Sequence, residues 1–102
     1  MTKIKPEEVR IYTESLADKI KAGVISENSR IEDKGLINCV EYANIIELSR
    51  DKPVVTYGHL QRTAVRAGAN VIAGARIQPI AQNQKTIYFV LYGDGYLVKE
   101  SK

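Results

Sequence analysis

The clearest pattern in this sequence is the alternation of side chains near the C-terminus. Over residues 86–99, one set of alternate positions is apolar or glycine, and the other set is largely aromatic or aliphatic. A period of two predicts a β-strand, because successive side chains of a strand point to opposite faces of the sheet. Gly93-Asp94-Gly95 leaves two interpretations open, a hairpin loop or one continuous strand with a bulge. We favour the continuous strand, because glycines inside strands mark bulges or a close backbone approach.

Two further strands are predicted upstream. Over residues 38–48, apolar side chains recur on one face, namely Val40, Tyr42, Ile46 and Leu48. Residues 69–80 form the other strand, which the polar stretch 82–85 turns back into the last strand. The polar stretch 26–35 is expected to be a connection within the same domain.

Residues 57–67 predict an amphipathic helix, since apolar residues recur there at helical spacing. Its apolar side consists of Tyr57, Leu60, Ala64 and Ala67, and its polar side of His59, Arg62 and Arg66. Thr56 is expected as the N-cap and Gly68 as the C-terminal stop. The small residues Ala64 and Ala67 would let this helix lie close against a sheet.

The N-terminal segment has two interpretations. Pro6 at a first helical position, acidic residues after it and Gly23 beyond its end predict a helix over residues 6–21. The alternative is a short strand at residues 9–13, which are rich in strand formers. With either interpretation, the predicted fold is α+β: a mainly antiparallel sheet with the helix at about residues 57–67 on one face.

Composition adds bounds to this fold. The chain has 102 residues, of which 44% are hydrophobic and 26% charged, so we expect a single domain over residues 1–102. No apolar stretch approaches the roughly 20 residues that span a bilayer, and no leader is recognisable. We therefore expect a cytoplasmic protein without membrane contact, although an exported protein lacking its leader would show the same pattern.

Both faces of the last strand are apolar or aromatic, and one helix can cover only one of them. The other face carries Tyr88, Val90, Tyr92 and Tyr96. Such a face is too apolar to stay bare, and tyrosine is common at interfaces. Either the N-terminal segment or another copy of the chain is expected to cover it. The leading hypothesis is thus a non-enzymatic module that self-associates or binds a protein partner through this face.

Catalytic and metal chemistry is poorly supported. The chain has one histidine, His59, and one cysteine, Cys39, on different elements, which is too few ligands for a metal site. A nucleophile–base pair of Cys39 and His59 is disfavoured, because a free cysteine is usually a buried apolar residue. Gly93-Asp94-Gly95 lacks the helix and lysine of a phosphate loop. No cofactor and no enzyme activity are therefore predicted, with an uncharacterised enzyme left as a low-weight alternative.

A second functional hypothesis concerns charge. His59, Arg62 and Arg66 form a basic stripe on the predicted helix, which suits an anion or a nucleic acid. The net charge of +3 is small for a nucleic-acid binder, so an ordinary solvated helix face is the preferred interpretation.

The run Leu-Gln-Arg-Thr-Ala-Val-Arg-Ala-Gly-Ala-Asn-Val-Ile at residues 60–72 and the closing Tyr-Gly-Asp-Gly-Tyr-Leu-Val-Lys at 92–99 are similar to parts of the YbjQ-like and RcsF-like small domains. The resemblance covers about half of the chain. It implies an α+β fold with a helix between strands, a strand near Val9 rather than a helix and, for the YbjQ-like members, a ring-shaped homo-oligomer. The heavy-metal binding that is attached to that group is not expected here, because the ligands are missing. The disulfides and the lipid anchor of RcsF-like members are not found in this sequence either. No functional residues transfer.

Overall fold

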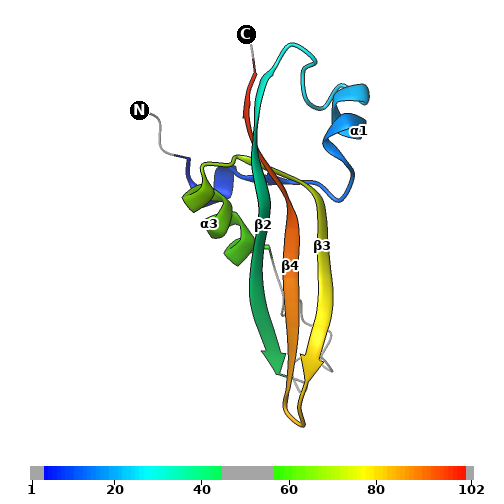
Figure 1. The fold of residues 1–102 in the computed structure, drawn as a ribbon, viewed down its shortest axis with the longest axis vertical. Helices are drawn as coiled ribbons and strands as arrows, with labels where there is room; N and C mark the ends of the chain where they lie inside the picture. The colour runs from blue at the N-terminus through cyan, green and yellow to red at the C-terminus, as the bar shows by residue number, and fades with distance from the viewer. Residues whose placement is uncertain (1–3, 45–56, 101–102) are drawn as a thin grey trace.

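The computed structural model describes residues 4–44 and 57–100. In chain order its elements are the 3-10 helix η1 (Pro6–Glu8), β1 (Arg10–Ile11), α1 (Leu16–Lys21), β2 (Arg30–Asn44), α3 (Gly58–Ala67), β3 (Val71–Gln82) and β4 (Thr86–Lys99). The strands form one sheet in the order β1-β3-β4-β2 (Figure 1). β4 pairs antiparallel with both β3 and β2, whereas β1 pairs parallel with β3. The predicted α+β class with a mainly antiparallel sheet is therefore confirmed.

β4 is one continuous strand, as we favoured, and it is central to the sheet. Gly93 and Gly95 lie within it and are buried, because Ile72 and Ile37 occupy the space where their side chains would be. The hairpin alternative is therefore wrong, and the explanation for the two glycines is close packing. The register irregularities of the sheet lie on the two neighbouring strands instead, between Asp33 and Gly35 in β2 and at two places in β3.

Helices α3 and α1 cover opposite faces of the sheet. α3 packs on one face, where Leu60 and Ala64 are fully buried in the main core. That core consists of Val9, Ile37, Cys39, Leu60, Ala64, Ala69, Ile72, Ala75 and Leu91. On the opposite face, α1 packs at the upper end of the sheet over a second cluster centred on Ile25, Val71 and Val98 (Figure 1).

The predicted helix at residues 57–67 is confirmed within one residue as Gly58–Ala67. Gly68 ends it in the left-handed conformation, with φ of 79°, as its expected role requires. Thr56 lies outside the described residues, and the position before the helix is taken by Tyr57 without a side-chain cap. Ala67 is exposed, so only Ala64 provides the close approach expected of both alanines.

The prediction of one helix over residues 6–21 is wrong, and the alternative of a strand near residues 9–13 is confirmed. β1 pairs Arg10 with Val71 and Ile11 with Ile72, so long-range pairing overrides local helix signals here. A helix begins only after Ser15, whose hydroxyl oxygen accepts a hydrogen bond from the Asp18 amide at 3.1 Å.

Other boundaries differ less. The strand predicted at residues 38–48 begins at Arg30, so most of the expected connection 26–35 belongs to β2, and Ile45–Leu48 lie outside the described residues. The strand predicted at 69–80 runs from Val71 to Gln82. The connection at 82–85 is a turn in which the Asn83 side chain accepts from the amides of Lys85 and Thr86, at 2.9 and 2.8 Å.

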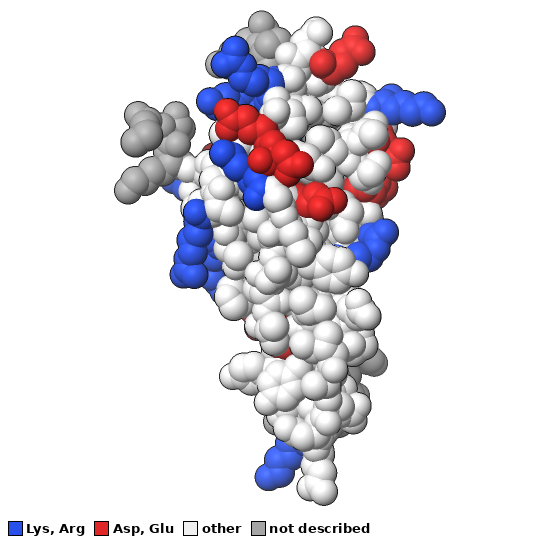
Figure 2. Space-filling view, in the orientation of Figure 1, with Lys and Arg blue, Asp and Glu red and all other residues white. Residues whose placement is uncertain are grey.

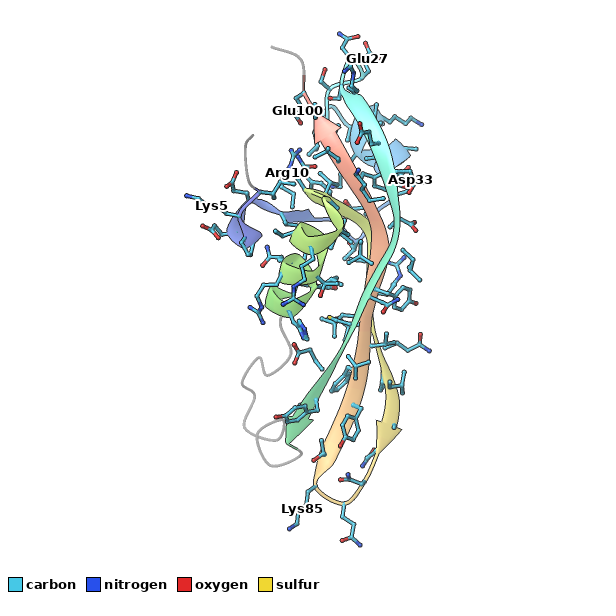
Figure 3. All side chains as sticks on the ribbon, turned by 60° about the vertical axis from the view of Figure 1, so that its left-hand side comes forward. Lys5, Arg10, Glu27, Asp33, Lys85 and Glu100 are labelled. Carbon is cyan, nitrogen blue, oxygen red and sulfur yellow. The ribbon has the colours of Figure 1, made fainter. Side chains whose placement is uncertain are left out.

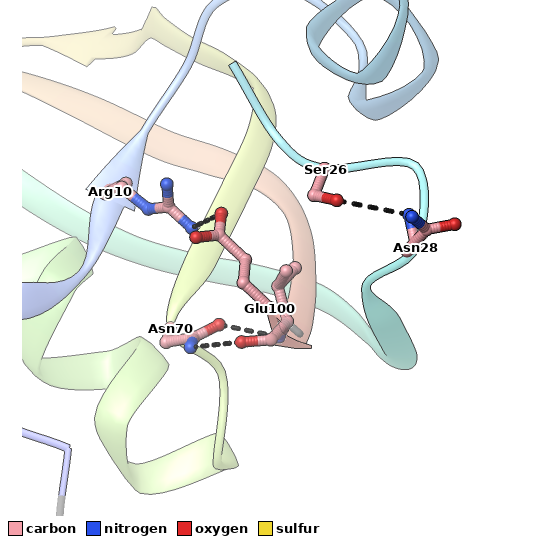
Figure 4. Close-up of polar contacts among 6 residues, drawn as sticks. Arg10, Ser26, Asn28, Asn70 and Glu100 are labelled. Atoms are coloured by element: carbon pink, nitrogen blue, oxygen red, sulfur yellow. Dashed lines mark hydrogen bonds and ion pairs between the residues drawn. The ribbon is translucent and has the colours of Figure 1, made fainter. Parts of the chain in front are cut away.

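Polar contacts fasten the end of β4 to the rest of the fold (Figure 4). The Asn70 side chain, just after α3, donates to the Val98 carbonyl at 2.9 Å and accepts from the Val98 amide at 2.8 Å. Arg10 of β1 pairs with Glu100 at 3.2 Å. These contacts fix the end of β4 that lies under α1.

The lower part of the sheet projects from this body (Figure 1). We call it the arm and define it as residues 36–43 of β2, 76–82 of β3, the turn 83–85 and residues 86–92 of β4. The molecule measures 50 × 29 × 21 Å as a result. Within the described residues, no helix is long and apolar enough to cross a bilayer.

Candidate association surface

One face of the arm is lined by apolar and aromatic side chains from β2 and β4. The pairing register puts Val40 opposite Val90 and Tyr42 opposite Tyr88, on the face away from α3. The rings of Tyr42 and Tyr88 are 6.3 Å apart between centroids and tilted by 51°, which is a favourable arrangement for an aromatic pair. We call this surface the aromatic face; its members are Leu36, Val40, Tyr42, Tyr88, Val90 and Tyr92.

The aromatic face is open to solvent. Tyr42 is 69% exposed, Leu36 61% and Val40 54%, while Tyr88 is 36% exposed. The remaining two members, Val90 and Tyr92, are half-buried. Figure 2 shows the lower half of the molecule as an almost entirely uncharged surface above a basic tip. Large side chains that are apolar, contiguous and this exposed are unusual on a monomeric protein.

The four residues predicted for the interface do not share one environment. Tyr88, Val90 and Tyr92 lie on the arm, but Tyr96 packs into the second cluster beneath the N-terminal segment, beside Val71 and Val98. Desolvation by burial raises the pKa of the Tyr96 hydroxyl, and the carboxylates of Asp94 and Asp33 raise it further. Of the two covers that the sequence allowed, the N-terminal segment therefore reaches only the upper end of the face.

Sequence reasoning missed the contribution of β2. Val40 and Tyr42 were placed on a common face, but Leu36 was not connected with them, and the three were not joined to the tyrosines of β4. The period of two that links residues 36, 38, 40 and 42 contained that signal. Only the register shows that this row lies beside Tyr88, Val90 and Tyr92.

The basic stripe lies on the outer side of α3, on the opposite face of the sheet from the aromatic face. Arg62 and Arg66 are exposed, and neither forms an ion pair with any of the described residues. His59 differs from them, since its Nδ1 lies 2.7 Å from Oε1 of Glu41 on β2. Of the three predicted anion-binding residues, Arg62 and Arg66 therefore have no ion-pair partner among the described residues, whereas His59 already contacts a carboxylate.

Cys39 lies on the same face of β2 as Glu41 and is buried in the main core. Burial raises the pKa of its thiol and the Glu41 carboxylate raises it further, while Arg62 acts in the opposite direction. A reactive thiolate requires the reverse balance. Across residues 4–44 and 57–100, no group of three His, Cys, Asp or Glu side chains is placed to hold a metal ion.

Comparison with known proteins bears on the fold alone. No family model matches the chain, and no curated protein does. A crystal structure from Pediococcus pentosaceus ATCC 25745, of a protein of unknown function that belongs to the DUF74 family, superposes with a TM-score of 0.52. Its sequence is 13% identical, and the match covers 91% of this chain and 98% of that one. The resemblance to YbjQ-like and RcsF-like domains is not addressed by this match and stays a prediction.

Proposed function

We propose that this chain is a non-enzymatic module that works by associating with further copies of itself through the aromatic face. The observation that carries the proposal is a contiguous, uncharged aromatic surface that no other described part of the chain covers. Tyrosine-rich apolar surfaces of this kind are enriched where proteins meet. The raised pKa of Cys39 and the engagement of His59 with Glu41 favour a binding role over a catalytic one.

The size of the exposed surface supports the same conclusion. The chain exposes 7022 Å², whereas a compact monomer of its mass exposes about 5,800 Å². The radius of gyration is 15.3 Å, against about 13 Å for a compact domain of this length.

The faces of the sheet are better suited to association than its edges. The upper edge of β3 is occupied by backbone hydrogen bonds to the N-terminal segment, including Tyr12 to Ile72 and Gly74 to Glu14. Further down the same edge, Pro79 has no amide hydrogen to donate. At the other border of the sheet, the first part of β2 carries exposed charged side chains at positions 32–34, which disfavour edge-to-edge pairing. Among the described residues, the aromatic face is thus a broad surface that remains uncovered.

Replacing Val40 by glutamate tests the proposal. Val40 is 54% exposed in the single chain, so Val40→Glu leaves folding intact but introduces a charge at the centre of the association surface. We expect wild-type protein to form oligomers at micromolar concentration, and the variant to dissociate toward the 11.4 kDa monomer. The expected loss is about 2 kcal/mol or more, about 30-fold in the dissociation constant.

Sedimentation velocity over a concentration series measures this, with circular dichroism to verify the fold. Ala67→Glu provides the matched control, because Ala67 is also an exposed apolar residue but lies on α3. The control should associate like the wild type. A wild-type chain that stays monomeric at all concentrations overturns the proposal, as does a Val40→Glu variant that associates normally.

A second candidate function is the binding of an anion, such as a nucleic acid, through α3. It is favoured by the absence of any ion-pair partner of Arg62 and Arg66 among the described residues, one helical turn apart on the exposed side. Fluorescence anisotropy with a mixed oligonucleotide pool at low salt tests it. Binding should weaken with added salt and in the Arg62→Ala/Arg66→Ala variant; no binding at low salt excludes this function.

A further inference from the structure

The aromatic face carries charge only at its two ends. Lys85 lies in the turn at the tip of the arm (Figure 3), and Asp94 lies on β4 at the base of the face, next to Tyr92. Both side chains are exposed, and neither forms an ion pair within the described residues. Each copy thus presents an unpaired cation at one end of an apolar strip and an unpaired carboxylate at the other.

Among the described residues, Arg76 and Asp33 also lie near the base, and each is held by hydrogen bonds within the chain. Arg76 lies opposite Tyr92 on β3, but its Nη1 donates to the carbonyls of Thr13 and Ala75, each at 2.9 Å. Asp33 lies higher, opposite Tyr96, and its Oδ1 accepts from the Gly35 amide at 2.7 Å. Asp94 is therefore a carboxylate that has no ion-pair partner among the described residues and can meet a cation from another copy.

The spacing of the two charges matches an antiparallel arrangement of arms. Val90 lies between them, five residues after Lys85 and four before Asp94, which corresponds to about 17 Å and about 14 Å along a strand. If a second arm lies on the first in the opposite direction, with Val90 over Val90, each Lys85 comes within about one residue of Asp94 of the other copy. A parallel arrangement instead brings like charges together at both ends.

α1 limits how far such an arm can reach. It covers the same face of the sheet above Asp94, where Tyr96 and Val98 pack against the second cluster. The free part of the face therefore extends from the tip turn to Asp94. A second arm can overlap with it only as far as the edge of α1, where the helix would block its tip. The length of the uncovered strip and the positions of its charges thus favour the same alignment of the two arms, with Val90 over Val90.

We propose that two copies pack arm against arm, face to face and antiparallel, about a twofold axis near Val90, with Lys85 of each copy beside Asp94 of the other. This inference rests on the proposed self-association and adds the orientation of the partner. It differs from the ring-shaped homo-oligomer that the resemblance to YbjQ-like domains implies. In this arrangement Tyr88 of one copy lies at the level of Tyr92 of the other, so the tyrosines fill the centre of a two-layer sandwich.

A charge exchange tests the orientation. Lys85→Glu and Asp94→Lys each replace two attractive contacts of the dimer by two repulsive ones, and each should raise the dissociation constant about tenfold. The double variant Lys85→Glu/Asp94→Lys restores both contacts and the wild-type net charge, and should return the constant to within about threefold of the wild type. Lys5→Glu, exposed next to η1 beside α3 on the opposite side of the sheet, provides the control for the charge change alone.

Cross-linking gives an independent readout in a Cys39→Ala background. Lys85→Cys chains mixed with Asp94→Cys chains should form a covalent dimer on oxidation, and neither variant alone should do so. If Val40→Glu prevents association but the double charge variant is not rescued, or if Lys85→Cys chains cross-link with themselves, the antiparallel arrangement is wrong while self-association stands. If the wild type is monomeric, both proposals are wrong.

Discussion

Gly93 shows how a single residue sets the packing of the whole sheet. It lies on the α3 side of β4, where a Cβ atom would stand 2.4 Å from Cγ2 of Ile72 and about 3.1 to 3.2 Å from backbone atoms of Ala73 and Ala75. The Cγ2 atom belongs to a branched side chain that is fully buried, so it has little freedom to move away. Only glycine therefore permits β3 and β4 to approach as they do.

We expect Gly93→Ala to lower the free energy of unfolding by about 1–3 kcal/mol through overpacking. Urea unfolding at one fixed protein concentration measures the loss, since self-association would otherwise shift the midpoint. In an Ile72→Ala background the same substitution should cost clearly less, because its main obstacle has been removed. Equal costs in both backgrounds would contradict the packing explanation. Arg30→Ala, at an exposed position of β2 far from the arm, serves as the neutral control.

At the scale of elements, the sequence correctly predicted those strands and helices whose position is set by the local pattern of apolar residues. The alternation over β4 and the helical spacing of Leu60 and Ala64 both appeared in the structure with nearly the expected bounds. The first part of β2 was missed because Glu32, Asp33 and Lys34 lie on an exposed strand at the border of the sheet, where polar side chains cost nothing. Their composition resembles a loop although their backbone is paired with β4.

The N-terminal segment was mispredicted because its structure depends on distant partners. Arg10 and Ile11 become a strand by pairing with β3, about 60 residues later in the chain, and no local rule contains that information. The signal for the true helix start was present, since Ser15 is followed three residues later by Asp18. It was outweighed by the helix signals at Pro6, the acidic residues after it and Gly23.

Only part of the candidate surface was predictable, because alternation within one strand is a local pattern whereas pairing between strands is not. Tyr88, Val90 and Tyr92 follow from alternation within one strand. The contribution of β2 requires the register between β2 and β4, and the loss of Tyr96 to the second cluster requires the position of α1. Period and composition thus identified the kind of surface, whereas its extent depends on contacts between elements that are far apart in the sequence.

The shape of the whole molecule depends on the stiffness of the arm. Three strands pair along its length, and the turn at its tip is braced by the two hydrogen bonds that Asn83 accepts. An arm built in this way should stay extended when it has no partner. The elongation of the chain is then a property of the single molecule, and the association surface is formed in advance of association.

We therefore expect the monomeric Val40→Glu variant to retain its elongated form. Small-angle X-ray scattering should give a radius of gyration near or slightly above the 15.3 Å of the Cα atoms, rather than the roughly 13 Å of a compact chain of this length. A stiff, pre-formed surface loses little conformational entropy on binding, which raises the affinity obtained from a given buried area. A value near 13 Å would mean that the arm folds back onto the body, and that association must first open it at a cost in affinity.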